Sequence, residues 1–194
     1  MSSEKIEQSG RRTPATEHVA FLRAVNVGGR NRVAMAHLRE LLSGLGYGAV
    51  RTHLQSGNAV FTVAVGTPPE EVALQIEGAL EAQLGLAARV LVRTRAELER
   101  VVAENPLLDV ASDHARMLVV FLDGAPDHEV MSELAPADFE PDVFALGERE
   151  IYAWYPDGVG ETRLSNAFWE RRLGLAATGR NWNTVTRLLE MMGE

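Results

Sequence analysis

Two short strands in direct succession, placed between two amphipathic helices, set the fold class of the first half of this chain. In the stretch AVRTHLQSGNAVFTV, residues 49–63, apolar and polar residues alternate on both sides of Ser56-Gly57-Asn58. Alternation with a period of two is typical of a half-buried strand, and Gly between two such runs predicts a tight hairpin with a two-residue turn. A hairpin is an antiparallel pair, so we do not expect a single doubly wound parallel sheet.

The segments around this hairpin complete a recognisable order. The apolar run HVAFLRAV, residues 18–25, predicts a strand covered on both faces, and ARVLVR, residues 88–93, predicts another. Apolar residues recur at helical spacing in residues 35–45 and again in residues 72–84, where Pro68-Pro69-Glu70 opens the second helix. Residues 18–93 are therefore predicted to run strand, helix, strand, strand, helix, strand, which is the split βαβ or ferredoxin-like arrangement.

The second half shows a similar order. Residues 94–115 are predicted as a connecting helix, capped by Thr94, and a loop. Residues 116–194 then contain an apolar strand, a short helix, a second hairpin and two helices, of which the first is capped by Ser165 and the last buries Trp182. We predict an α+β fold of two ferredoxin-like subdomains packed together, 18–93 and 116–194, with antiparallel or mixed sheets and helices on them.

Composition narrows the functional classes. The chain has 194 residues, no cysteine and a formal net charge of −8. Without cysteine there is no disulfide, iron–sulfur cluster or cysteine nucleophile, which fits a cytosolic (cytoplasmic) protein. The negative charge disfavours nucleic acid as a partner, since duplex binding needs a basic face. Residues 1–17 are polar and are expected to be a disordered tail, neither a signal peptide nor a membrane span, and no membrane partner is expected.

The stretch RAVNVGGRNRV, residues 23–33, is the first candidate site. Two glycines at a strand-to-helix junction let a ligand approach the main chain, whose free N–H groups can bind an anion, and Arg30 or Arg32 could supply a guanidinium. The pattern is neither a dinucleotide-binding fingerprint nor a P-loop. A tight turn that merely requires glycine explains the same residues.

Two further stretches are candidates. Ser56-Gly57-Asn58 could present main-chain amides to a ligand, although Ser-Gly and Gly-Asn are also ordinary hairpin turns. Thr178-Gly179-Arg180-Asn181 precedes the last helix, where Asn181 could act as a cap; capping leaves Arg180 unexplained. All three stretches are expected to be loops, the places where scaffolds usually present binding groups.

Catalytic signatures are scarce, so catalytic residues are unknown. The five histidines lack the spacing of metal ligands, and we expect neither a metal nor a cofactor. The RNA-binding signature of ferredoxin-like sheets is absent, and Phe21 and Phe61 are assigned to the core.

At these motifs the chain resembles a bacterial family known as domain of unknown function 1697. The resemblance is carried by FLRAVNVGGRNRVAMAHLRELL, VRTHLQSGNAVF, YPDGVGETRLS and TGRNWNTVTRLLEM, in the family's order and over most of residues 19–192. It implies a cytosolic α+β protein of two ferredoxin-like subdomains. It implies no activity, and no catalytic residue is carried over. Arg30 stands where the family has Lys, which keeps a cation there, whereas Gly179 stands where the family has Thr.

Two functional hypotheses follow. The first is a cleft that binds a small anionic ligand, bearing phosphate or carboxylate, with Arg30 or Arg180 facing into it. The residues that would form it are Arg23, Asn26, Gly28, Gly29, Arg30, Gln55, Asn58, Arg180 and Asn181. The second is a nucleic-acid or protein interaction module without catalysis. A concave pocket would favour the first, and a flat basic or aromatic sheet face would favour the second.

Overall fold

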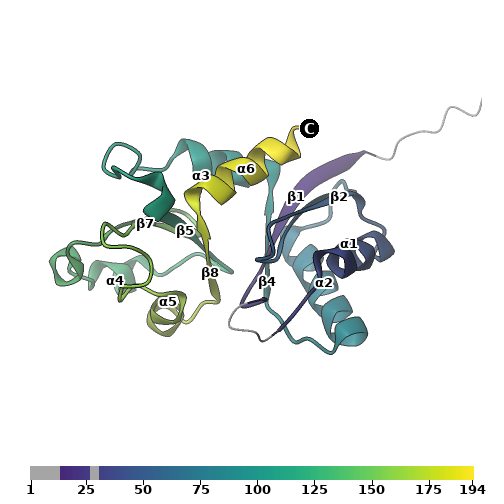
Figure 1. Cartoon of the computed structure of the whole chain (residues 1–194), viewed down its shortest axis with the longest axis horizontal. Helices are drawn as coiled ribbons and strands as arrows, with labels where there is room; N and C mark the ends of the chain where they lie inside the picture. Colours follow the sequence, from purple (N-terminus) through teal and green to yellow (C-terminus); the bar gives the residue numbers. More distant parts are fainter. Residues whose placement is uncertain (1–13, 27–30) are drawn as a thin grey trace, which may run out of the picture.

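The first half of the chain forms a four-stranded antiparallel sheet with two helices on one face (Figure 1). The computed structural model describes residues 14–26 and 31–194. The elements of this half are β1 (Ala15–Leu22), α1 (Met35–Gly44), β2 (Gly48–His53), β3 (Asn58–Ala64), α2 (Pro69–Leu84) and β4 (Val90–Thr94). The strand order is β2-β3-β1-β4, and each neighbouring pair is antiparallel, as the hairpin β2–β3 requires.

The second half repeats this pattern. After α3 (Arg95–Ala103), its elements are β5 (Met117–Leu122), α4 (His128–Ser132), β6 (Val143–Leu146), β7 (Glu150–Trp154), α5 (Asn166–Leu173), β8 (Ala177–Asn181) and α6 (Trp182–Met192), with short 3₁₀ turns at His114–Arg116 and Pro136–Phe139. The strand order β6-β7-β5-β8 has the same form as that of the first sheet. The described residues thus form an α+β fold with two antiparallel sheets and six α-helices, which confirms the predicted class at this level.

The last strand, β8, was not predicted from the sequence. Residues 178–181 were predicted to be a loop before the final helix, but they pair with residues 118–121 of β5, with Arg180 opposite Val119. The sequence ATGRN contains no β-branched apolar residue, and Gly and Asn are depleted in strands. Residues 177–181 therefore form a strand because β5 offers them an unpaired edge. Pairing there satisfies the main-chain N–H and C=O groups of both segments, an effect that intrinsic strand propensity does not include.

Two boundaries also differ from the predictions. Strand β1 begins at Ala15, so residues 15–17 belong to the sheet and not to a tail, while residues 1–13 lie outside the described residues. The β2–β3 connection is a four-residue loop, Leu54 to Gly57, and not a two-residue turn. Leu54 and Gly57 both have positive φ, and a Cβ on Gly57 would lie 2.4 Å from the side chain of Val25. Gly57 is therefore required by close packing as well as by φ.

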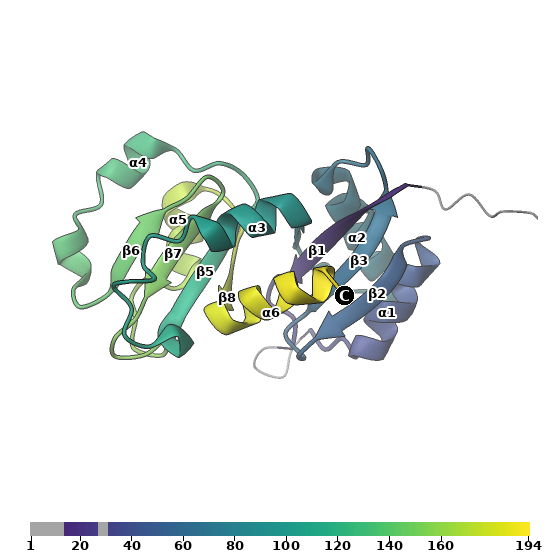
Figure 2. The same ribbon diagram turned by 90° about the horizontal axis from the view of Figure 1, so that it is seen from above.

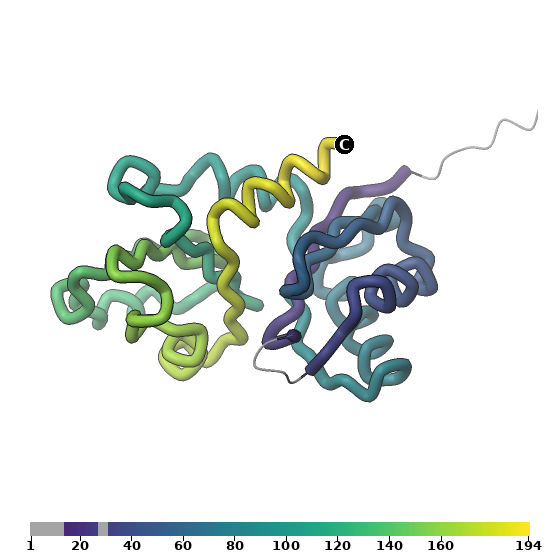
Figure 3. Tube along the Cα trace, viewed as in Figure 1, coloured from purple at the N-terminus to yellow at the C-terminus, as the bar shows by residue number. Residues whose placement is uncertain are grey.

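The second faces of the two sheets share one core with α3 and α6. Phe21 of β1 stacks on Phe121 of β5 with ring centroids 4.1 Å apart, and both are fully buried. Helices α3 and α6 lie next to each other over this core (Figure 2). Helix α6 crosses from the second half onto the first, as the tube in Figure 3 shows. Trp182, at the start of α6, is 6% exposed, as its helical spacing predicts.

The helix caps follow the sequence closely. Thr94 accepts a hydrogen bond from the main chain of Glu97, whose side chain returns to the main chain of Thr94, so a full capping box begins α3. Ser165 caps α5 in the same way through the N–H of Phe168. Both caps confirm the predicted helix starts.

One buried titratable group in β1 links folding to pH. His18 is 1% exposed; its Nδ1 donates to the carbonyl of Thr16 over 3.0 Å, and its ring stacks near that of Phe61. Its Nε2 is buried without a partner among the described residues. Desolvation by burial lowers the pKa of His18 from its ordinary value, and the hydrogen bond to Thr16 and the nearby Glu97 offset this only in part.

We predict that His18 makes the protein less stable in mild acid. Below the ordinary histidine pKa of about 6.5, the unfolded chain binds a proton that the native state does not accept, so stability falls until pH reaches the lowered native pKa. Urea unfolding between pH 7.5 and 5 should show this loss in the native chain. His18→Gln should lose less over the same range, whereas the exposed His37→Gln should behave as the native chain does. Equal pH dependence in all three would contradict the prediction.

Candidate functional site

A cleft of about 480 Å³ lies between the two halves, where the end of β1 faces β8 and the first turn of α5. It is lined by Leu22, Arg23, Ala24, Val25, Ser56, Asn166, Ala167, Thr178, Gly179, Arg180, Asn181 and Thr184. Segments far apart in the sequence therefore meet, and residues of all three stretches singled out by their composition line the cleft. The cleft contains three of the predicted site residues: Arg23, Arg180 and Asn181.

Arg180 is held entirely by protein groups. Its Nε donates to the side-chain oxygen of Asn58, and its Nη1 donates to the hydroxyl of Thr178 and the carbonyl of Gly179. Its Nη2 donates to the carbonyls of Leu22, over 2.8 Å, and Ser56, over 3.2 Å. A guanidinium has five N–H groups, and these five bonds use all of them. Arg180 therefore has no donor to spare for an anion, contrary to the expectation that its guanidinium faces a ligand.

The surroundings of Arg180 account for its electrostatics. The residue is 7% exposed, and its guanidinium lies 5.5 Å from the centroid of the Phe21 ring, within cation–π range. Desolvation by burial lowers the pKa of Arg180 to about 10. The side chain stays charged at neutral pH, and carbonyl and hydroxyl oxygens, rather than a carboxylate, compensate that charge.

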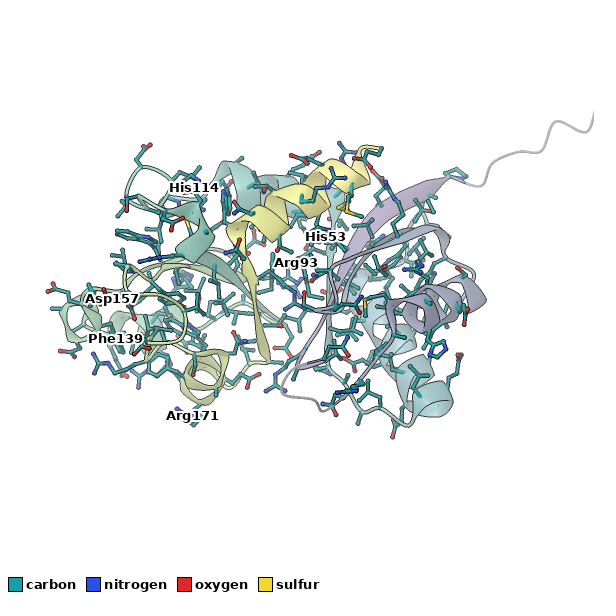
Figure 4. The ribbon with its side chains drawn as sticks, in the orientation of Figure 1. His53, Arg93, His114, Phe139, Asp157 and Arg171 are labelled. Atoms are coloured by element: carbon teal, nitrogen blue, oxygen red, sulfur yellow. The ribbon has the colours of Figure 1, made fainter. Side chains whose placement is uncertain are left out.

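Arg93 of β4 occupies the equivalent place in the first half. Its Nη2 donates to the carbonyls of Leu122 and Arg149, over 2.6 and 3.0 Å, and its guanidinium lies 5.7 Å from the Phe121 ring. Arg93 pairs with Val19 of β1 just as Arg180 pairs with Val119 of β5. Figure 4 shows Arg93 in the middle of the molecule, between the halves. Each half thus sends one buried arginine across to main-chain oxygens of the other.

Three asparagines of the predicted site also have structural contacts. Asn26 has positive φ and bonds through its side chain to Val33 and to the carbonyl of Gln55, which fixes the segment after β1 against the β2–β3 loop. Asn58, fully buried, bonds to His53, Ser56 and Arg180. Asn181 caps α6 through the N–H of Asn183, as predicted, and donates to the carbonyl of Ala115.

Arg23 differs from Arg180 in having a donor to spare. It is the first residue after β1. Its Nε and Nη2 donate to the two carboxylate oxygens of Glu170 on α5 in a bidentate ion pair, in which the Nη2 bond measures 2.6 Å. Glu170 raises the pKa of Arg23 by this hydrogen bonding. The Nη1 of Arg23 makes no hydrogen bond to any described residue, and the side chain is 38% exposed. Among Arg23 and Arg180, Arg23 is the one able to contact a ligand.

The remaining predicted residues lie beside the cleft or outside the described part of the chain. Gly28, Gly29 and Arg30 belong to residues 27–30, which lie outside the described residues. Gln55 lines a neighbouring hollow of about 360 Å³ together with Asn26, Arg32, Val33 and Ala34.

The repeat places a second cleft at the equivalent position, along β4 and the first turns of α2, and its charge differs. It is smaller, about 180 Å³, and its lining includes three arginines and three acids: Arg89, Arg93, Arg149, Glu70, Glu77 and Asp123. These form ion pairs, among them Arg149–Glu70 and Arg89–Asp123, both 3.0 Å. The larger cleft has two arginines and no acid among the described residues that line it. Glu170, which is not among these lining residues, pairs with Arg23, so one of the two arginines keeps no acidic partner among the described residues. The larger cleft is therefore the more positive of the two, in a chain of net charge −8.

Neither sheet presents a flat aromatic face. One face of the first sheet packs on α1 and α2, and one face of the second packs on α4 and α5. The other two faces share the central core with α3 and α6. Of the phenylalanines on the strands, Phe21, Phe61 and Phe121 are at most 2% exposed, and the half-buried Phe144 packs against the ring of Trp169. Phe21 and Phe61 are core residues, as predicted. A concave site is favoured over an open sheet surface.

The described residues contain no cluster of three or more His, Asp or Glu side chains placed to hold a metal ion. None of the helices in the described part of the chain is long and apolar enough to cross a membrane. The cytosolic location stays a prediction.

Comparison with known proteins places the chain in a family. The family model described as "Protein of unknown function (DUF1697)" matches residues 15–152, so the chain belongs to this family, as its motifs indicated. Two of those motifs, in residues 155–165 and 178–191, lie beyond the matched range. No curated protein matches the chain.

A solved structure supports the fold. The chain is similar to a conserved bacterial protein from Streptococcus pneumoniae, with 22% identity and a TM-score of 0.69 over 92% of this chain and 99% of the other. At this identity the likeness shows the shared fold and carries no activity.

Sequence reasoning missed Glu170 and Arg93. Glu170 lies on the helix NAFWERRL among other charged residues, where solvation is the ordinary expectation. Arg93 ends an apolar strand, ARVLVR, and the alternation of that strand places it on the same face as Leu91. That alternation was a readable signal that Arg93 faces a core.

We predict that Arg180→Met destabilises the protein strongly. The change leaves buried oxygens on Asn58, Thr178 and Leu22 without their donor, each at a cost of about 1–3 kcal/mol, so a loss of about 3 kcal/mol or more is expected in urea unfolding. The matched control is Arg171→Met on α5, an exposed arginine that points away from the protein (Figure 4), which should change stability by less than about 0.5 kcal/mol. A loss below about 1 kcal/mol for Arg180→Met would show that these bonds are not structural.

Proposed function

We propose that this protein binds a small anionic molecule in the cleft between its halves. The observation that carries the proposal is the contrast between the two repeated clefts. In the smaller one, three acids of the lining match its three arginines, whereas the larger one has two arginines with a single acidic partner, Glu170 on Arg23, and adds amide and hydroxyl groups. Concave sites with a few convergent polar groups are the usual binding sites for small molecules.

Arg23 would make the main contact in this proposal. A planar guanidinium recognises phosphate and carboxylate alike, because both present paired oxygens. Asn166 and Ser56 lie on the same cleft and would orient the rest of the ligand. Arg180 would position β8 and supply a fixed positive charge without touching the ligand.

We also propose that each half is a ferredoxin-like unit, with the chain divided into 18–93, 94–115 and 116–194 as predicted, except that the first unit begins at Ala15, where β1 begins. The element order β-α-β-β-α-β in both halves, and the matching strand orders β2-β3-β1-β4 and β6-β7-β5-β8, support this assignment.

The test of anion binding is a titration of ¹⁵N-labelled protein with inorganic phosphate and, separately, with succinate at constant ionic strength. We expect main-chain shifts to gather on residues 22–25 and 178–181. Arg23→Gln should weaken binding by about tenfold or more, because hydrogen bonds to charged groups contribute about 1.5–3 kcal/mol.

The matched control is Arg89→Gln in the smaller cleft, since Arg89 is also half-exposed and also paired with acids. This variant should bind as the native chain does. The absence of binding by either anion, or shifts that gather away from the larger cleft, would overturn the proposed function.

A further inference from the structure

Glu170 lies where a ligand's anion would contact Arg23. Both of its carboxylate oxygens accept hydrogen bonds from Arg23, and Oε1 also accepts the main-chain N–H of Ala177, over 3.1 Å. The contact joins α5 of the second half to the end of β1 in the first. These hydrogen bonds hold the carboxylate in place, and the side chain of Glu170 is 21% exposed, so water still reaches it.

The repeat shows which part of this arrangement is structural. In the first half, Glu77 of α2 accepts the N–H of Val90 at the start of β4, over 2.8 Å, just as Glu170 accepts the N–H at the start of β8. A glutamate that caps an edge strand from the neighbouring helix is thus common to both halves. Glu77 also pairs with Arg89, but that arginine has a second acid, Asp123, at 3.0 Å. Arg23 has Glu170 alone among the described residues.

We propose that Glu170 is a built-in competitor that occupies Arg23 when the cleft is empty and must yield it when an anion binds. This inference rests on the proposed function and adds the residue that sets its affinity. The carboxylate of Glu170 supplies the same paired oxygens as the ligand's phosphate or carboxylate, so the two cannot hold the Nε and Nη2 edge of Arg23 together. An anion bound only at Nη1 would lie close to a second negative charge, which weakens it.

The competitor is also a contact between the halves. Release of Arg23 by Glu170 removes an ion pair across the mouth of the cleft, while the bond from Glu170 to Ala177 lies within the second half and can remain. The buried contacts of Arg180 keep the halves joined in either state. Binding therefore exchanges one partner of Arg23 for another and requires no separation of the halves.

The experiment compares four proteins in the phosphate and succinate titrations: the native chain, Glu170→Gln, Glu77→Gln and the double variant Arg23→Gln/Glu170→Gln. Glutamine keeps an oxygen for the N–H of Ala177 but carries no charge. We expect Glu170→Gln to bind about tenfold tighter than the native chain, Glu77→Gln to bind equally, and the double variant to lose the gain. In the native chain, phosphate should shift the Arg23 Nε–H resonance and leave the Ala177 N–H nearly unchanged.

The outcomes separate the two proposals. If the native chain binds an anion in the cleft and Glu170→Gln binds no tighter, Glu170 is not a competitor and the proposed function stands. If Glu77→Gln raises the affinity for the anion as much as Glu170→Gln does, the increase comes from the change in net charge alone and the inference fails. Binding by none of the four proteins overturns both proposals. If Glu170→Gln does not fold, the native chain still tests the inference. An Arg23 Nε–H resonance that does not shift when phosphate binds would overturn it.

Discussion

The relative placement of the two halves depends on two buried guanidinium groups, each of which reaches from one half into the other. Arg93 and Arg180 each lie over a phenylalanine of a central strand and donate to main-chain oxygens of the opposite half. A buried charge without partners costs several kcal/mol, so each arginine holds its acceptors in place as firmly as they hold it. The hydrophobic contact of Phe21 with Phe121 has little directional preference; these hydrogen bonds fix how the two sheets face one another.

The internal repeat also shows how two equivalent clefts of one molecule come to differ in charge. Equivalent strands, helices and edge-capping glutamates produce two clefts of similar construction. In one of them, acids from α2 and the end of β5 fill the space with ion pairs. In the other, the equivalent helix begins with Asn166 and Ala167, and the position after the central strand holds Arg23 instead of Asp123. The loss of an acid at the start of the helix and one reversal of charge, from Asp123 to Arg23, thus make one of two equivalent clefts more positive than the other.

Hydrophobic periodicity, together with capping and turn residues, predicted most of the fold. The hairpin between the two helices, the caps at Thr94 and Ser165 and the buried face of Trp182 all follow from local patterns, because each depends on neighbours within one or two turns. Strand β8 does not follow from a local pattern, because its residues are poor strand formers. It forms because it pairs with the free edge of β5, which lies about 60 residues away in the sequence. The candidate site shows the same division: the sequence indicated the segments that meet, but not which of their polar groups are already in use.

By itself the sequence determined the α+β class, the antiparallel hairpins, the core faces and the family, because alternation, capping residues and motifs are local properties of the chain. The tertiary structure decided which arginine is structural and which is available. Arg23 and Arg180 look alike in sequence, each close to asparagine and glycine. Only the packing of the halves places carbonyl oxygens around all five donors of Arg180 and leaves Arg23 at the mouth of the cleft with Glu170. Hydrogen-bond partners far apart in the chain are set by geometry, which no local pattern encodes.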